Sequence, residues 1–272
     1  MKSILYLTDY AYQAKGRRYC DEDIRITDFL RGRFHVATCH PACCEPFLDA
    51  ADLVVFRNTG AVSGFQKAYE AFKARVAQKG MRTYNDFTGK ADMAGKQYLL
   101  DMTAAGMRVI PSVDNKDDIG KLPVAERYVL KPKGGADSIG LEFLTFDELL
   151  QREVPGGEML IQPAVDFEYE VSFYFMDGEF EYAMYAPDTK ARWQLVPYEA
   201  SEADLAFARE FVEWNTIEHG IQRVDACRTR GGELLLVELE DLNPYLSIDR
   251  LDAAACDRFL LRFADALDKA AK

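Results

Sequence analysis

The sequence lacks several features that would assign it to a large class of proteins. None of its apolar runs is long enough to cross a membrane, and its first residues lack the apolar core of a secretory signal peptide. Basic residues are in the minority, 33 against 45 acidic ones, so the net charge is −12 and non-specific binding to nucleic acid is disfavoured. We therefore expect a cytoplasmic protein that needs neither a membrane nor a nucleic acid as its partner.

The usual signatures of nucleophilic, redox and zinc chemistry are also missing. Only three histidines are present, and none forms a convincing arrangement with a serine or a cysteine. No G-x-G-x-x-G follows the first expected strand, so a nicotinamide-dependent oxidoreductase lacks its main support. Cys39, Cys43 and Cys44 lie near two histidines, but their C-x3-C-C spacing matches no usual zinc site. Reduced thiols, packed or at the surface, are the favoured interpretation.

What is present indicates a globular protein with an α/β beginning. With 272 residues, of which 49% are hydrophobic, the chain is long enough for two or three lobes. Short apolar strands alternate with helical stretches near the start, as in an open α/β sheet. The expected strands are 4–7, 34–37, 53–56 and 81–84, and the expected helices are 24–30 and 66–78.

The remainder predicts a small lobe followed by a larger one that is rich in antiparallel strands. A helix is expected over 92–105, ended by Gly106, and residues 112–127 are interpreted as a polar linker. The large lobe should contain two hairpins, one turning at Asp177-Gly178 and the other at Gly231-Gly232. Further expected elements are a strand over 159–162, a capped helix that begins after Ser201, and a final helix that buries Phe259, Phe263 and Leu267.

The stretch YVLKPKGGADSIG, residues 128–140, combines a lysine with a glycine-rich loop. Lys131 ends a short β-rich segment, and three glycines and a serine follow it. Glycines let backbone N–H groups approach a ligand closely, and the lysine adds a positive charge, a combination that suits polyphosphate. No helix follows the loop, so the motif is neither a P-loop nor a Rossmann fingerprint. A glycine-rich hairpin with an incidental lysine would look similar.

Three carboxylates are expected on one face of the second hairpin. Glu238 and Glu240 end the apolar strand LLLVELE, and their spacing of two residues directs both side chains to one face. Asp225 lies on the preceding strand. Such carboxylates repel each other unless a cation binds, and their oxygens suit Mg²⁺ or Mn²⁺. Asn243 could add a neutral oxygen, whereas the alternative is a solvated acidic strand end.

This order of elements resembles the ATP-grasp superfamily, to which glutathione synthetase and D-alanine–D-alanine ligase belong and in which two lobes close on Mg·ATP. The resemblance covers nearly the whole chain, and the segment GKQYLLDMTAAG, residues 95–106, looks like the lysine-bearing helix before the small lobe. It implies an α/β (α+β) fold class: an open α/β domain over 1–90, a small lobe over 91–158 and a large lobe over 159–272. The superfamily's last strand usually reads Glu-x-Asn, whereas this chain has Glu238-Leu-Glu240, so the register of the metal ligands stays open by a residue or two.

The resemblance also implies roles for the matching positions. Lys96 and Lys131 would bind the ATP phosphates, and Arg192 would contact the γ-phosphate or an acyl phosphate. The lid over the phosphates would be formed by Gly134, Gly135, Ser138 and Gly140. Adenine would bind at the segment with Gln162, Ala164 and Val165, and the ribose at Glu170, with Glu168 as a rival. The metal ligands would be Asp225, Glu238, Glu240 and Asn243.

The implied reaction has two steps, in which a carboxylate takes the γ-phosphate of ATP and an amine or a thiol then displaces phosphate from the acyl phosphate. No side-chain nucleophile is required, in agreement with the absence of one. The substrates would be a small-molecule carboxylate and amine, with an amino acid or a small peptide favoured. A small-molecule kinase and a non-catalytic nucleotide-binding protein stay open, as does a homodimer.

Substrate contacts are expected at Arg57 and Asn58, because both follow the strand over 53–56 and ligands bind at the carboxyl ends of such strands. A surface arginine at a strand end is an equally good interpretation, and the same ambiguity applies to Arg17 and Arg18. Nearby tyrosines could line a pocket, but the core is the favoured place for them; they are Tyr6, Tyr10, Tyr12 and Tyr19.

Overall fold

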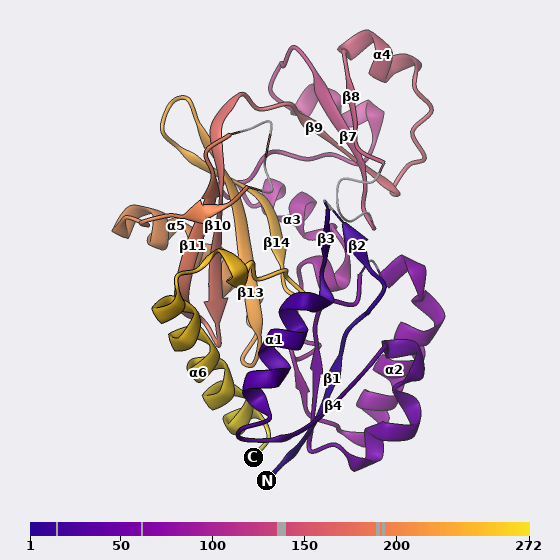
Figure 1. The fold of residues 1–272 in the computed structure, drawn as a ribbon. Coiled ribbons are helices and arrows are strands. Elements are labelled where there is room, and N and C mark those ends of the chain that lie inside the picture. Colours follow the sequence, from indigo (N-terminus) through magenta and orange to yellow (C-terminus); the bar gives the residue numbers. More distant parts are fainter. Residues whose placement is uncertain (15, 61, 135–139, 189–190, 192–193) are drawn as a thin grey trace.

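The computed structural model describes all 272 residues except 15, 61, 135–139, 189–190 and 192–193. The described residues form sheets of four, five, three and two strands (Figure 1). Short 3-10 turns occur between them, at Pro41–Cys43, Glu45–Ala50, Val62–Gly64, Asp92–Ala94, Lys116–Lys121 and Ile248–Arg250. No helix in this part of the chain has the length and apolarity that a membrane crossing needs.

The N-terminal region is the predicted open α/β sheet. Its strands are parallel, and their order is β4-β1-β5-β6. The bounds are β1 Ser3–Leu7, β4 His35–Cys39, β5 Leu53–Phe56 and β6 Thr83–Tyr84, with helices α1 Cys20–Leu30 and α2 Gln66–Lys79. All of β5 and nearly all of β1 are buried, which explains their unbroken apolar sequences. A small hairpin, β2 Gln13–Ala14 and β3 Arg17–Arg18, lies between β1 and α1.

The helix expected over 92–105 is shorter than predicted. A 3-10 turn covers Asp92–Ala94, and helix α3 covers only Tyr98–Ala104. Between them Gly95 has a φ of 87°, in the left-handed region that interrupts a helix and that glycine tolerates best. Lys96 therefore stands in the loop before α3, where its backbone N–H donates to the carbonyl of Lys133 (3.3 Å). Gly106, with a φ of 69°, follows the end of α3 as predicted.

The small lobe is a three-stranded antiparallel sheet in the order β8-β7-β9. Its elements are β7 Tyr128–Pro132, β8 Glu142–Leu144, helix α4 Phe146–Gln151 and β9 Met159–Pro163. The sequence analysis placed β9 at the start of the large lobe, but its backbone pairs with β7. Part of the predicted linker belongs to this lobe, since Val113, Ile119 and Leu122 bury their side chains in its core.

The large lobe is a five-stranded sheet in the order β12-β11-β10-β13-β14. Its strands are β10 Phe167–Met176, β11 Glu179–Ala186, β12 Val196–Pro197, β13 Ile221–Thr229 and β14 Leu234–Glu240. Asp177 and Gly178 turn the first hairpin with φ values of 49° and 81°, as a two-residue turn of this kind requires. Helix α5, Glu202–Asn215, begins with the predicted capping box of Ser201 and Asp204.

The last helix, α6 Ala253–Ala270, joins the N-terminal sheet to the large sheet (Figure 1). Phe259, Phe263 and Leu267 are buried, as their spacing predicts. They share one hydrophobic cluster with Ile4 of β1 and Tyr174 of β10. The two sheets are therefore held together through a common core.

Candidate active site

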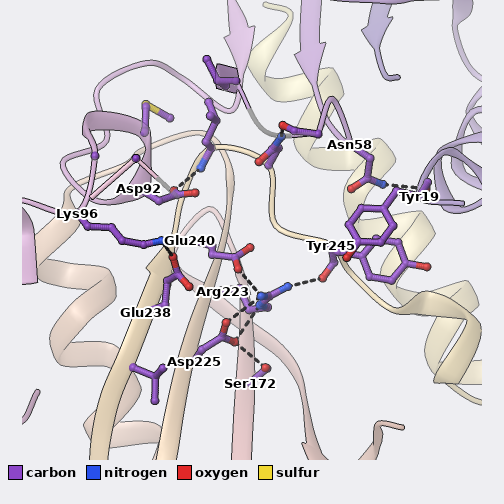
Figure 2. A pocket seen from close by; sticks show the side chains of 18 of the residues that line it. Tyr19, Asn58, Asp92, Lys96, Ser172, Arg223, Asp225, Glu238, Glu240 and Tyr245 are labelled. Atoms are coloured by element: carbon purple, nitrogen blue, oxygen red, sulfur yellow. Dashed lines mark hydrogen bonds and ion pairs between the residues drawn. The ribbon is translucent and has the colours of Figure 1, made fainter. Parts of the chain in front are cut away.

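A cavity of about 810 Å³ lies where the N-terminal region, the loop before α3 and the large sheet meet. Figure 2 shows side chains from all three around it. The charged or polar residues on its sheet side are Glu170, Ser172, Arg223, Asp225, Glu238, Glu240 and Asn243, and those on its opposite sides include Arg17, Asn58, Lys73, Lys96 and Lys133.

The pairing of β13 with β14 gathers the three predicted carboxylates. Asp225 lies directly opposite Glu238, and Arg223 lies directly opposite Glu240. On the other side of β13, Ser172 of β10 lies opposite Asp225 and donates a hydrogen bond to its Oδ1 (2.6 Å). Antiparallel neighbours project to the same face, which is why residues so far apart in the sequence line one wall of the cavity.

Arg223 occupies the centre of this wall, and the sequence analysis missed it. Its Nε and Nη2 donate to the two carboxylate oxygens of Asp225 (2.9 and 2.8 Å), and Nη2 also donates to Glu240. Its Nη1 donates to the backbone carbonyl of Tyr245 (3.0 Å). Burial alone would lower the pKa of this guanidinium, but Asp225 and Glu240 hold it well above its usual value. The signal was available, because Arg223 stands two residues before Asp225 on the same strand face.

Two lysines face the remaining carboxylate. The ammonium of Lys96 donates to Glu238. Burial disfavours both charges, yet their mutual attraction raises the pKa of Lys96 and lowers that of Glu238. Lys131 of β7 is half-buried, and desolvation of its ammonium lowers its pKa to about 8 although Glu238 opposes the shift. Lys96, in the loop before α3, and Lys131, on β7, thus both lie near Glu238, and their role with phosphates stays a prediction.

Carboxylate oxygens of this wall suit Mg²⁺ by their chemistry, but they are already paired. Within the described residues no group of three or more acidic, histidine or cysteine side chains converges as a metal site would. Instead Arg223 spans Asp225 and Glu240, and Lys96 covers Glu238. Burial raises the pKa of Glu240 to about 7, with Arg223 opposing this shift and the other carboxylates adding to it. The carboxylates therefore fit a divalent metal ion once the side chains of Lys96 and Arg223 move away from them. The assignment of the metal ligands stays a prediction.

Several predicted nucleotide-binding residues lie at the cavity and others do not. Gly134 and Glu170 line it, whereas Glu168 is exposed. Gln162 is buried and donates to Ser112 and to the carbonyl of Ile110, and its side chain thus serves the small-lobe core. Gly140 has a φ of 76°. Ala164 and Val165 are half-buried beyond β9. Gly135, Ser138 and Arg192 lie outside the described residues.

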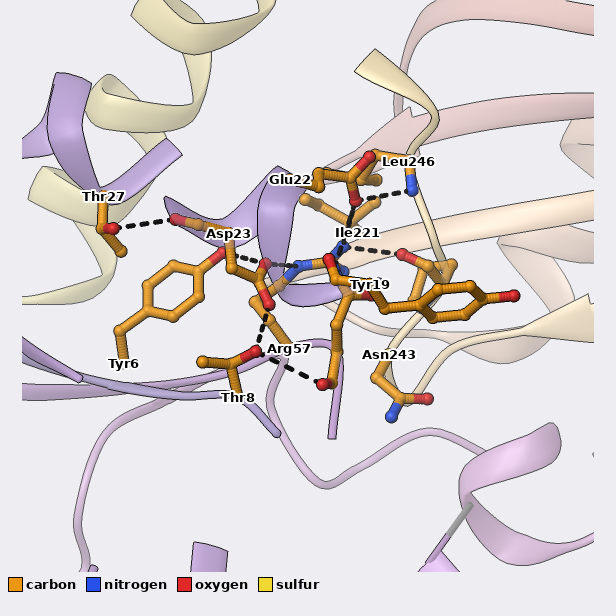
Figure 3. A network of polar contacts seen from close by, with 12 residues as sticks. Tyr6, Thr8, Tyr19, Glu22, Asp23, Thr27, Arg57, Ile221, Asn243 and Leu246 are labelled. Atoms are coloured by element: carbon orange, nitrogen blue, oxygen red, sulfur yellow. Dashed lines mark hydrogen bonds and ion pairs between the residues drawn. The ribbon is translucent and has the colours of Figure 1, made fainter. Parts of the chain in front are cut away.

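Arg57 does not reach the cavity, contrary to the predicted substrate contact. Its side chain is 0% exposed and lies in a polar network between the N-terminal region and the large lobe (Figure 3). Nη2 donates to the carbonyl of Pro244 (2.7 Å), and Glu22 and Asp23 lie at 3.5 and 4.0 Å. Asn58, the next residue, does line the cavity, and its amide donates to the carbonyl of Tyr19 (3.2 Å). Strand direction alone could not separate the two.

The tyrosines of the N-terminal region divide between the core and the cavity. Tyr6 is fully buried and donates to Asp23 (2.8 Å), as the core prediction expects. Tyr12 and Tyr19 line the cavity instead, beside Tyr245 from the segment after β14. Tyr10 is 45% exposed. The cavity thus has an acidic and cationic end on the sheet and an aromatic end on the N-terminal region.

Similar proteins were found by comparing structures and not by comparing sequences. No family model and no curated protein matches the sequence. The fold is similar to a D-cycloserine synthetase, with a TM-score of 0.74 and 22% identity over 99% of this chain and 100% of that one. It is also similar to a D-alanine–D-alanine ligase from Bacillus anthracis, with a TM-score of 0.66 and 14% identity over 99% and 96%.

A third similar structure is an ATP-grasp ligase from Chryseobacterium gregarium, associated with ribosomal peptide modification and solved with ADP and a leader and core peptide. Its TM-score is 0.65 at 14% identity, over 99% of this chain and 97% of that one. Identities this low show a shared fold and leave the substrates of this chain undetermined. The protein has the ATP-grasp fold, as the resemblance of its sequence predicted.

Proposed function

We propose that the protein is an ATP- and Mg²⁺-dependent ligase that joins a carboxylate to an amine, or to a thiol, through an acyl phosphate. The observation that supports this most is the composition of a single cavity. Lysines on its small-lobe side face a wall of three carboxylates and one arginine on the large sheet. The fold shared with ATP-dependent ligases adds support.

In this proposal Lys96, Lys131 and Lys133 bind the phosphates, and the acidic wall holds the metal. Its ligands would come from Asp225, Glu238, Glu240 and Asn243. When bound, Mg²⁺ would neutralise phosphate oxygens and favour transfer of the phosphoryl group. The polyphosphate would draw Lys96 away from Glu238 and Arg223 away from Asp225, which would free those carboxylates. Arg223 would then contact the transferred phosphoryl group, because a guanidinium can bind two such oxygens at once.

The covalent steps need no nucleophile from the protein. A carboxylate oxygen of the substrate attacks the γ-phosphorus, and the bond to the bridging oxygen breaks to release ADP. The amine or thiol of the second substrate then attacks the acyl carbon and loses a proton, and inorganic phosphate leaves with the former carboxylate oxygen and takes up that proton. The protein positions the reactants and stabilises the negative charge of the transition states.

The proposal can be tested by titrating ATP into the protein in a calorimeter, with and without Mg²⁺. We expect binding that Mg²⁺ strengthens and that the Lys131→Ala variant loses by tenfold or more. Lys67→Ala is a matched control, because Lys67 is exposed on α2. Absence of Mg²⁺-dependent ATP binding in the unmodified protein would refute the proposal.

The metal assignment has its own test in the Glu238→Gln variant. It retains the size of the side chain but removes the charge, so we expect Mg²⁺-dependent release of ADP in a screen of amino acids and peptides to be lost while the circular dichroism spectrum is unchanged. Unchanged turnover would exclude Glu238 as a ligand. Analysis of the product separates the reaction classes, since a stable phosphorylated product would indicate a small-molecule kinase.

A further inference from the structure

The aromatic end of the cavity is built from three tyrosines that come from two distant segments. Tyr12 meets Tyr19 edge to face, with ring centroids 5.3 Å apart. Tyr19 in turn stacks on Tyr245 at 4.4 Å, with an interplanar angle of 26°. Figure 2 shows Tyr19 and Tyr245 side by side at one end of the cavity, with Lys96 and Glu238 at the other. A packed row of rings offers a firm apolar wall to the carbon skeleton of a ligand.

A guanidinium stands at this aromatic end. Arg17 of β3 lines the cavity, its central carbon lies 5.8 Å from the centroid of the Tyr245 ring, and its side chain is 17% exposed. Asp249, which is 51% exposed, lies 4.0 Å from its Nη1. The adjacent Arg18 does not line the cavity; it is 53% exposed and donates to Asp21 (2.7 Å).

Tyr245 connects the two arginines of the cavity. Its ring contacts Arg17, and its backbone carbonyl accepts a hydrogen bond from Arg223. The cavity therefore carries an arginine at each end, Arg17 beside the tyrosines and Arg223 on the acidic wall. A ligand that lies along Tyr245 would meet Arg17 with one end and Arg223 with the other.

At this end of the cavity the ring of Tyr12 packs closely against the backbone of Gly60. Gly60 has a φ of 70°, and a Cβ atom there would stand 2.6 Å from Cδ2 of Tyr12. The whole cavity, about 810 Å³, is within the range of roughly 300–1,000 Å³ that is usual for one small ligand. Since the nucleotide phosphates would occupy part of this volume, the remainder at the aromatic end suits a small molecule.

We propose that the aromatic end binds a small substrate through a carboxylate that is not the one phosphorylated. That carboxylate pairs with Arg17, the three tyrosines cover the carbon skeleton, and the reacting group points toward Arg223. This inference rests on the proposed ligase function and specifies its substrate class. Two kinds of molecule share the required chemistry, an amino acid that supplies the amine and a dicarboxylate that supplies the activated acid.

The test uses the full-length protein saturated with Mg·ADP. The probes are D- and L-alanine, D- and L-serine, and succinate. Each is compared with an amide in which the carboxylate that would pair with Arg17 is replaced by a neutral carboxamide. We expect at least one acid to bind in the calorimeter at least tenfold more tightly than its amide. Preference for an amino acid or for succinate identifies which of the two kinds of substrate the site accepts.

Variants of Arg17 and of its neighbours then test whether Arg17 causes the tighter binding of the acid. Arg17→Gln should weaken binding of the acid at least tenfold, Arg17→Lys should restore part of it, and Arg18→Gln should leave it unchanged. In turnover assays with the same acid, Arg17→Gln should raise KM more than it lowers kcat, while binding of Mg·ADP stays the same in every variant. Gly60→Ala, whose added methyl group would displace the ring of Tyr12, should also weaken binding of the acid.

The outcomes separate this inference from the function on which it rests. If Mg·ADP binds but no probe acid binds, or if acids and amides bind equally, the inference is overturned and the ligase proposal stands. If Arg17→Gln binds the acid as the unmodified protein does, Arg17 is not the partner and the inference fails. If Mg·ADP itself does not bind, both proposals fail together.

Discussion

At the scale of single residues, burial alters the chemistry of the side chains that the sequence identifies. Lys131 is an ordinary lysine in the printed sequence, but its place on β7 lowers its pKa to about 8, mainly because burial disfavours the ammonium. Lys96 is buried, yet its pKa is raised because Glu238 attracts its ammonium and accepts a hydrogen bond from it. The two predicted phosphate ligands therefore differ in how they respond to pH.

From the lowered pKa of Lys131 we predict that ATP binding is accompanied by uptake of a proton near pH 8. In the empty site about half of the Lys131 side chains are charged at that pH, and a phosphate anion favours the charged form and raises the pKa. ATP affinity should therefore fall as the pH rises through 8. Calorimetry in two buffers of different ionisation enthalpy should show an uptake of about half a proton at pH 8 and about a tenth at pH 7. Lys131→Met should abolish the uptake, and an equal uptake in that variant would contradict the assignment.

At the scale of elements, the loop before α3 is fixed to the end of β14 by two aspartates. The carboxylate of Asp241 accepts from the backbone N–H groups of Ala91 (2.9 Å) and Met93 (2.7 Å). In return, Asp92 Oδ1 accepts from the N–H groups of Asp241 (2.6 Å) and Leu242 (3.0 Å). This reciprocal contact sets the loop that carries Lys96 against the strand that carries Glu238.

We expect the Asp241→Asn variant to lose about 1–3 kcal/mol of unfolding free energy, because an amide NH₂ group would face backbone donors in a buried site. ATP affinity should fall as well, since the position of Lys96 depends on the loop. Urea denaturation and calorimetry measure the two effects. Asp101→Asn, at an exposed position on α3, is the matched control. If Asp241→Asn retained full stability, the loop would be held by other contacts.

At the scale of the whole molecule, a polar network and a hydrophobic cluster join the N-terminal region to the large lobe. Glu22 accepts from the backbone N–H groups of Leu246 (2.9 Å) and Ile248 (3.2 Å), beside the buried Arg57 (Figure 3). Burial raises the pKa of Glu22 to about 7, although Arg57 opposes the shift. Separation of the two parts would expose both this network and the cluster around α6.

From the raised pKa of Glu22 we predict that its contribution to the free energy of unfolding decreases as the pH rises. Its pKa is higher in the folded state than in the unfolded state, so the folded protein binds the proton more tightly. The resulting stabilisation is complete below about pH 4.5 and is lost as the pH rises toward 7. Urea denaturation at several pH values should give a more negative slope of unfolding free energy against pH for the unmodified protein than for Glu22→Gln. Equal slopes would show that Glu22 does not titrate in this range, and Glu153→Gln is the exposed control.

The sequence by itself determined most of the elements, their order and much of the acidic wall. Alternation along β14 places Glu238 and Glu240 on one face, and the turn residues at Asp177-Gly178 fix a hairpin, because such patterns depend only on neighbours along the chain. The ATP-grasp fold could be predicted from that order. The roles of the wall residues in binding metal and nucleotide stay predictions.

Only the tertiary structure decided which arginines and tyrosines reach the cavity. Arg57 is buried because Glu22, Asp23 and Pro244 surround it, and Arg223 lines the cavity because Asp225, Glu240 and Tyr245 hold it there. Several of these partners are far from the arginines in sequence. Burial of a charge depends on whether such distant groups compensate it, and no local pattern encodes that. The same reason explains why Tyr6 fills the core while Tyr12 and Tyr19 face the cavity.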